Sequence, residues 1–145
     1  MKLDRIMLRI QKIWFDDSHL FGMDCDGVVY KQSLLWYPRL YNATTEQKNN
    51  YELGIDGMHW RNIDEDISFD SFEERNNVEP TPMQRFFLTH KEINVAGIAK
   101  IIGVNPTLLR DYTYGWKKPS PKRVREIQEG IRKYAQLLQQ VDFSQ

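Results

Sequence analysis

Cysteine is nearly absent from this chain of 145 residues, in which Cys25 stands alone. A single thiol excludes an intrachain disulfide framework and a zinc site built from several cysteines. Long apolar runs are absent too, since none approaches the ~18 residues of a membrane-spanning helix. The first residues, MKLDRIMLRIQKIW, alternate and carry charges, unlike a signal peptide. We therefore expect a cytoplasmic protein in which Cys25 packs within a strand.

The net charge is zero, but the two halves of the chain differ in sign. Residues 1–80 contain 9 Lys and Arg against 15 Asp and Glu, a net charge of −6. Residues 81–145 contain 11 against 5, a net charge of +6. This polarity indicates a basic module for a polyanion and an acidic module with another role. The alternative is that opposite charges help the two halves dock.

The acidic half has the patterns of a small α+β domain. Apolar residues alternate from Ile6 through residue 15 and again over residues 21–25, and a third run follows the hairpin signal Asp26-Gly27. These predict a three-stranded antiparallel meander. Short helices are predicted near Pro38 and, from capping-box spacing, after Thr44. A last strand pair is expected over residues 51–55 and 58–63, around the turn at Asp56-Gly57.

One motif in this half is HWRNIDEDI, from His59 to Ile67. With YPRL at residues 37–40 and NAT at 42–44, it resembles a small bacterial family known only as a domain of unknown function, over roughly residues 5–75. That family's signature is His-Trp-x-x-Ile/Leu-Asp-Glu-Asp-Ile/Leu. The resemblance implies no settled activity. Some of its members occur as small partners in toxin–antitoxin-like pairs, and others carry a helix-turn-helix behind the domain.

The same motif raises the question of a metal site or of acid–base chemistry. One His beside Asp64, Glu65 and Asp66 has the right ligand types, but no second His lies at helical spacing. We instead expect Trp60 and Ile63 in the core. His59 and the carboxylates are then expected to cap loop amides, to pair with Arg39 or Arg61, or to form an acidic docking patch. We expect no enzyme activity, no catalytic residues, no metal and no cofactor.

A polar segment with two prolines separates the halves. We predict an α+β domain at residues 1–75, a linker at 76–82 and a helical DNA-binding domain at 83–145. Its first helix is expected to start near Thr81, with Pro82 in the first turn. Met83, Phe86 and Phe87 are expected to face its core.

Residues 94–120 carry the most informative pattern in the chain. Asn94 is a good cap for a helix over 95–102, Gly103 suits its end, and Val104 is an apolar plug. Asn105 and Pro106 begin a second helix, which Gly115 ends before the basic loop WKKPS at 116–120. Leu109 and Tyr112 predict the inner face of this helix, leaving Thr107, Arg110, Asp111 and Tyr114 outside.

This stretch resembles the lambda-repressor and Xre-like family of helix-turn-helix domains, without a gap over residues 94–120. The resemblance implies an all-α, lambda-repressor-like domain whose second helix enters the DNA major groove. The chain departs from the family pattern at Pro106, where many relatives place a polar, base-contacting side chain, and at Val95, where relatives often have a glutamine. These departures bear on sequence-specific reading, not on the fold.

The last helix is predicted to begin at Ser120-Pro121. Apolar residues then recur at steps of three and four, namely Val124, Ile127, Ile131, Tyr134, Leu138 and Val141. This stripe predicts either a helix packed on its own domain or, from Ile131 onward, a dimer interface. A homodimer is expected, and either domain could supply its interface.

We expect a sequence-specific protein for double-stranded DNA that acts as a transcriptional regulator. Thr107, Arg110 and Asp111 are the candidates for base contacts, with Tyr114 on the same face. Phosphate contacts are expected from Lys100, Asn105, Lys117, Lys118, Lys122 and Arg123. The alternative is an antitoxin-like interaction module whose acidic N-terminal domain binds a partner protein.

Overall fold

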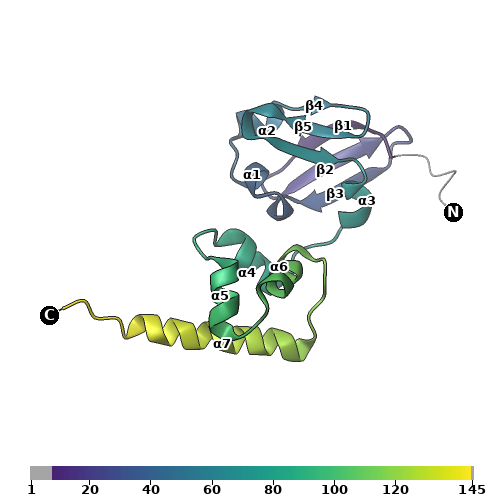
Figure 1. The fold of residues 1–145 in the computed structure, drawn as a ribbon. Helices are drawn as coiled ribbons and strands as arrows, with labels where there is room; N and C mark the ends of the chain where they lie inside the picture. The colour runs from purple at the N-terminus through teal and green to yellow at the C-terminus, as the bar shows by residue number, and fades with distance from the viewer. Residues whose placement is uncertain (1–7, 145) are drawn as a thin grey trace. The chain divides into compact units, whose positions relative to one another are not determined.

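The computed structural model describes residues 8–144, which divide into two compact units, one ending at Pro80 and the other beginning at Thr81. The first unit contains two sheets and short helices, and the second contains helices alone (Figure 1). The predicted α+β class is therefore confirmed. The expected start of the first strand at Ile6 falls outside the described residues. No helix among residues 8–144 has the length and apolarity to cross a membrane.

The first sheet is the predicted antiparallel meander, in the order β1-β2-β3. Its strands are β1 (Ile10–Phe15), β2 (His19–Asp24) and β3 (Val29–Ser33). The Asp24 carboxylate accepts hydrogen bonds of 2.9 Å from the amides of Asp26 and Val28 and so ends β2. The expectation of a packed strand thiol is wrong, because Cys25 lies in this turn and is exposed.

A second antiparallel sheet has the order β4-β5-β6. Its strands are β4 (Glu52–Leu53), β5 (Gly57–Trp60) and β6 (Glu65–Ser68). The sequence predicted a strand pair here and missed β6, in which Ile67 is the one buried side chain. Two 3-10 turns and three short helices complete the unit: η1 (Leu34–Trp36), α1 (Pro38–Tyr41), α2 (Thr45–Asn49), η2 (Arg61–Ile63) and α3 (Ser71–Arg75).

Both sheets contribute to one apolar core in this unit. Trp60 from β5, Leu20 from β2 and Phe72 from α3 are each less than 2 % exposed. The ring of Phe72 passes so close to β2 that a Cβ added at Gly22 would lie 2.7 Å from it. The glycine therefore allows α3 to approach the sheet at this point.

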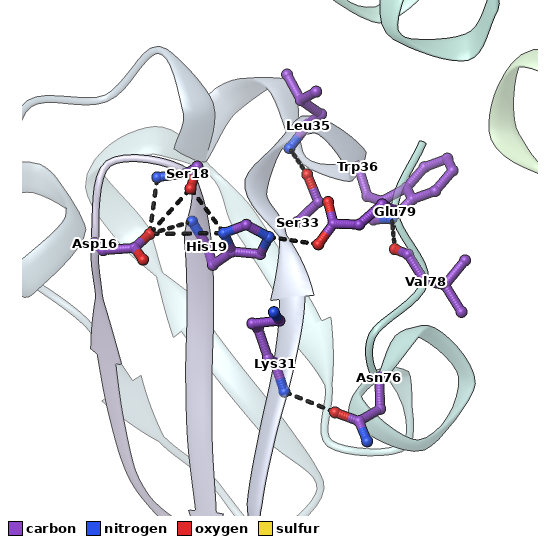
Figure 2. A network of polar contacts seen from close by, with 10 residues as sticks. All are labelled: Asp16, Ser18, His19, Lys31, Ser33, Leu35, Trp36, Asn76, Val78 and Glu79. Carbon is purple, nitrogen blue, oxygen red and sulfur yellow. Dashed lines mark hydrogen bonds and ion pairs between the residues drawn. The ribbon is translucent and has the colours of Figure 1, made fainter. Parts of the chain in front are cut away.

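The segment predicted as a linker, residues 76–82, is instead divided between the two units. The Asn76 side chain accepts a hydrogen bond of 2.8 Å from the Lys31 amide, and the Trp36 indole donates one of 3.3 Å to the Val78 carbonyl. His19 Nε2 lies 2.6 Å from Glu79 Oε1 (Figure 2). We call residues 76–80 the strap, because these contacts hold it against the first unit. Its last residue, Pro80, is buried.

The second unit consists of four helices. They are α4 (Pro82–Thr89), α5 (Val95–Ile102), α6 (Pro106–Tyr114) and α7 (Pro121–Gln139). Thr81 caps α4, with Gln84 completing a reciprocal capping box. The predicted caps Asn94, Asn105 and Ser120 are confirmed, since each side chain accepts a hydrogen bond from the first turn of its helix.

The core of this unit forms where α5, α6 and α7 meet. Ala99, Leu109 and Ile127 are each no more than 1 % exposed. Phe87 is buried, and Met83 and Phe86 are partly buried against this core, as predicted. The α7 stripe is buried at Ile127, half-buried at Ile131 and Tyr134, and exposed at Leu138. Figure 1 shows α7 continuing past the other helices of its unit. The first part of the stripe therefore packs on its own unit, and its end does not.

Candidate nucleic-acid interface

A tight turn joins α5 to α6. Gly103 ends α5 with a φ of 78°, in the left-handed region that a glycine adopts without strain. Val104 follows and is buried. The Asn105 side chain then accepts hydrogen bonds of 2.9 and 3.2 Å from the amides of Thr107 and Leu108. The turn thus fixes where α6 starts relative to α5, and Asn105 serves as its cap.

The outer face of α6 carries the predicted base-contact residues. Positions 107, 110, 111 and 114 follow the spacing i, i+3, i+4, i+7, which places them along one face of a helix. Thr107 and Arg110 are exposed, and Asp111 and Tyr114 are half-buried. The opposite face buries Leu109, Tyr112 and Thr113. The predicted inner and outer faces of this helix are therefore the observed ones.

The opposite face is also anchored by polar contacts. Gln84 Nε2 on α4 donates a buried hydrogen bond of 2.9 Å to the Tyr112 carbonyl. The Thr113 hydroxyl donates one of 2.9 Å to the Leu109 carbonyl, which satisfies this buried oxygen within α6. These bonds make α6 a fixed support for the side chains on its outer face.

An ion pair joins α6 to the basic loop at residues 116–120. Lys117 Nζ lies 3.7 Å from Asp111 Oδ2. The Asp111 carbonyl also accepts hydrogen bonds from the backbone amides of Trp116, at 2.9 Å, and Lys117, at 3.3 Å. The structure therefore brings two of the predicted site residues together, with an acid at the base of the cationic loop.

The other predicted cations come from three separate elements. Lys100 lies on α5, Lys118 in the loop, and Lys122 at the start of α7, and all three are exposed. Arg123 is half-buried and pairs with Glu126 at 3.2 Å. Three of these four side chains present a free-standing charge to solvent, while Arg123 is partly neutralised. Exposed lysines of this kind suit contacts to phosphate, which need charge more than fixed geometry.

Sequence reasoning missed one residue of this surface, Trp116. Its side chain is 74 % exposed, between Gly115 and the two lysines. No local signal marks it, because Tyr112 and Tyr114 lie nearby in the sequence as potential apolar partners. Only the folded chain shows that its side chain stays exposed.

The acidic motif of the first unit forms a cross-strand contact. His59 on β5 is paired in register with Asp66 on β6, and its Nδ1 lies 2.6 Å from Asp66 Oδ1. Trp60 is buried and Ile63 packs against the core, as predicted. Of the two arginines that were expected to pair with the motif's carboxylates, Arg39 acts through its charge on Glu65. Arg39 donates to the Asp64 backbone carbonyl, and Arg61 pairs with Glu52 at 3.2 Å.

The carboxylates of this motif do not converge on one point. Burial raises the pKa of Glu65, whose Oε1 accepts a hydrogen bond from the Asp66 amide at 3.2 Å. Within residues 8–144, no group of three or more His, Cys, Asp and Glu side chains is arranged to hold a metal ion. The geometry of the motif is that of two strands and a turn held by local polar contacts.

Comparison with known proteins concerns this first unit. Residues 11–78 match a family described as "Protein of unknown function (DUF2442)". The chain has no match among curated proteins or among solved structures. The match begins just inside β1 and ends within the strap, so it covers both sheets. Residues 11–78 of this chain are therefore similar to that family of unknown function, over just under half of the sequence.

Proposed function

We propose that this protein binds double-stranded DNA through a helix-turn-helix formed by α5 and α6 and acts as a transcriptional regulator. The observation that carries the proposal is the outward row of α6, presented beside a capped tight turn and a cationic loop. In a lambda-repressor-like domain, the helix in the place of α6 enters the major groove and the helix before it crosses the backbone.

Three properties of the second unit support this assignment. Ala99 is fully buried, which allows α5 and α6 to cross closely. Gly103 and Val104 provide the turn and its plug. The unit as a whole has a net charge of +6, which suits a polyanion. A helical pair built only for packing needs the turn but not the exposed cations around it.

The side chains divide into two roles. Arg110 is suited to bidentate contact with guanine, and Thr107 and Asp111 to neighbouring base edges, with Tyr114 at the far end of the row. Phosphate contacts are assigned to six positions that are exposed or half-buried. They are Lys100, Asn105, Lys117, Lys118, Lys122 and Arg123. Base contacts set sequence preference, whereas phosphate contacts set affinity on any sequence.

The test is fluorescence anisotropy with a labelled random duplex at two salt concentrations. Wild-type affinity should fall steeply with salt, and Lys117→Ala/Lys118→Ala should weaken binding and reduce the slope of log K against log[salt] by about one to two, because Lys117 is shared with Asp111. Arg132→Ala/Lys133→Ala is the matched control, because it removes two positive charges from exposed positions farther along α7. Arg110→Ala should instead change the preferred sequence in a selection experiment. Salt-independent or undetectable wild-type binding would refute the proposal.

We also propose that the protein is a homodimer that uses the end of α7. Leu137 and Leu138 are 59 % and 54 % exposed there. Leu138 also lines an apolar groove of about 180 Å³, together with Phe86, Ile131 and Tyr134. A twofold dimer would bury both the leucines and the groove and would match a twofold DNA site.

The alternative class is an antitoxin-like module whose acidic first unit binds a protein. It would be favoured if the purified protein showed no retention of DNA and instead co-purified with a small basic protein encoded beside it. The anisotropy experiment therefore separates the two functions, because salt-sensitive DNA binding belongs only to the first.

A further inference from the structure

Trp116 is an exposed indole in a chain that otherwise covers its tryptophans. Trp36 and Trp60 are buried, Trp14 is half-buried, and Trp116 is 74 % exposed. Burial of a tryptophan side chain is among the largest apolar contributions to folding, so an uncovered one forgoes that gain. The exposure of Trp116 therefore indicates a role at the protein surface.

The backbone around Trp116 is held in a defined motif. Gly115 has a φ of 82°, and its amide donates to the Tyr112 carbonyl at 3.3 Å. The Trp116 amide donates to the Asp111 carbonyl at 2.9 Å. These two bonds form the Schellman arrangement that ends helices. The Cα of Trp116 is therefore tied to the last turn of α6.

In a Schellman motif, the residue in the place of Trp116 often makes an apolar contact with the last turns of the helix. Here those turns present Arg110 and Asp111, which offer no apolar partner. The indole consequently does not seal the end of α6. Its position is anchored, but its side chain is left to solvent, so packing within the unit does not explain it.

Two lysines follow Trp116 directly in the sequence. The combination of an indole with two cations indicates what kind of partner surface this part of the protein can bind. Lys117 and Lys118 are exposed, so an apolar ring and two cations are presented together at the end of α6. A nucleic-acid strand offers the complementary pair, because anionic phosphates alternate with the apolar faces of the sugars. Contacts to sugars and phosphates carry no base identity, so an aromatic ring on a sugar face binds with little dependence on sequence.

Resting on the proposed function, we propose that Trp116 is a DNA-contact residue that packs on the deoxyribose of the backbone strand whose phosphates Lys117 and Lys118 neutralise. The indole contributes apolar contact and no charge. Its contribution is therefore independent of salt, unlike that of the lysines. The salt dependence of binding therefore distinguishes the contribution of the indole from that of the lysines.

The test compares Trp116→Ala, Trp116→Phe and wild type against a labelled random duplex at two salt concentrations. Trp116→Ala should weaken binding by roughly ten-fold at both salts with an unchanged salt slope, and Trp116→Phe should recover most of the loss. Ile55→Ala is the matched control, because Ile55 is 75 % exposed but lies in the first unit, and it should bind as wild type.

A second readout does not depend on any change in affinity. Acrylamide should quench wild-type tryptophan fluorescence less in the presence of the duplex, because binding covers the one largely exposed indole in the described chain. Trp116→Phe should show no such protection. If wild type binds and Trp116→Ala binds equally well, or if the duplex gives no protection, the inference is overturned and the proposed function stands. If wild type fails to bind, both fall.

Discussion

Gln84 and Tyr112 are joined by a buried hydrogen bond of 2.9 Å from the side-chain amide of one to the backbone carbonyl of the other. The same Gln84 side chain accepts a hydrogen bond of 2.9 Å from the Thr81 amide. One residue thus caps α4 and fixes α6 against it. The orientation of the proposed recognition helix therefore depends on a side chain that lies outside both helices of the turn.

Replacing Gln84 with Ala should destabilise the second unit. The change leaves the Thr81 amide without its partner and removes one of two hydrogen bonds to the Tyr112 carbonyl, which keeps the bond from the Gly115 amide, so the cost should be about 1–2 kcal/mol. Urea denaturation followed by circular dichroism measures this loss. Gln136→Ala, at an exposed position of α7, is the control and should be close to wild type. An unchanged midpoint for Gln84→Ala would contradict the role given to this bond.

Glycine-to-alanine substitutions at two positions within helices should change the stability of the second unit in opposite directions. At Gly97 the nearest neighbour of a new Cβ would be Asn94, at the ordinary contact distance of 3.4 Å, so the gain in helix propensity should stabilise by up to about 1 kcal/mol. At Gly130 it would lie 2.5 Å from Ile102 Cβ, where α7 crosses α5. Overpacking there costs about 1–3 kcal/mol and should outweigh the propensity gain. Thermal melts of the two variants decide this, and equal melting temperatures would exclude the close crossing.

Removing the charge of Asp111 should strengthen binding to random DNA. Asp111→Asn keeps the shape of the side chain, takes a negative charge away from the proposed interface and releases Lys117 from its ion pair. We expect binding to tighten several-fold at low salt, with the salt slope steeper by up to about one. Asp142→Asn makes the same charge change beyond the end of α7. Weaker binding of Asp111→Asn would show instead that the ion pair is needed to position the loop.

The turn before β2 should confer a pH-dependent share of stability. Burial acts to raise the pKa of Asp16, but hydrogen bonds from the amides of Ser18 and His19 outweigh it and lower that pKa below its usual value. The unfolded chain therefore binds this proton more readily, and the contribution is lost as the pH falls through the folded pKa.

Asp16→Asn tests this dependence. It should lower the stability of the first unit by no more than about 1 kcal/mol at pH 7, since the carboxylate is largely exposed. The difference from wild type should shrink below about pH 4. Asp17→Asn is the neighbouring control. A difference that stays constant between pH 7 and pH 3 in denaturant titrations would contradict the assignment.

The dimer proposed through α7 predicts a disruptive substitution. Leu138→Glu places a charge on the exposed end of the stripe, next to the apolar groove, and should give a monomer in sedimentation velocity at tens of micromolar. Gln136→Glu adds the same charge to an exposed polar position of α7 and should leave the dimer intact. A wild-type protein that sediments as a monomer would refute this interface, as would a Leu138→Glu variant that remains dimeric.

Local chemistry explains why much of the second unit is predictable from sequence. Asn94, Gly103, Asn105 and Gly115 act within one helical turn of their own position, so their residue types alone announce where helices begin and end. The same holds for the Asp26-Gly27 hairpin, where Gly27 has a φ of 81°. Contacts between residues close in sequence leave a signal in the sequence.

Long-range contacts left no such signal. The strand β6 was missed for a different reason: it pairs with its sequence neighbour β5, but with a single buried side chain, Ile67, and three polar ones it shows too little apolar alternation to be predicted. The strap reads as a linker because Asn76 and Glu79 are polar, yet their partners Lys31 and His19 lie on distant strands. The exposure of Trp116 is of the same kind, since only the packed chain shows that nothing covers a side chain.

The strap also determines where the chain can be divided into two fragments that are expressed separately. The first unit ends at Pro80, which is buried, and the second begins at Thr81, which caps α4. A fragment that stops at residue 75 would remove the acceptors of the Trp36 indole and the Lys31 amide. One that starts at residue 83 would lack Thr81 and so lose both hydrogen bonds of the α4 capping box. Expression of either half in isolation should respect one boundary, after residue 80.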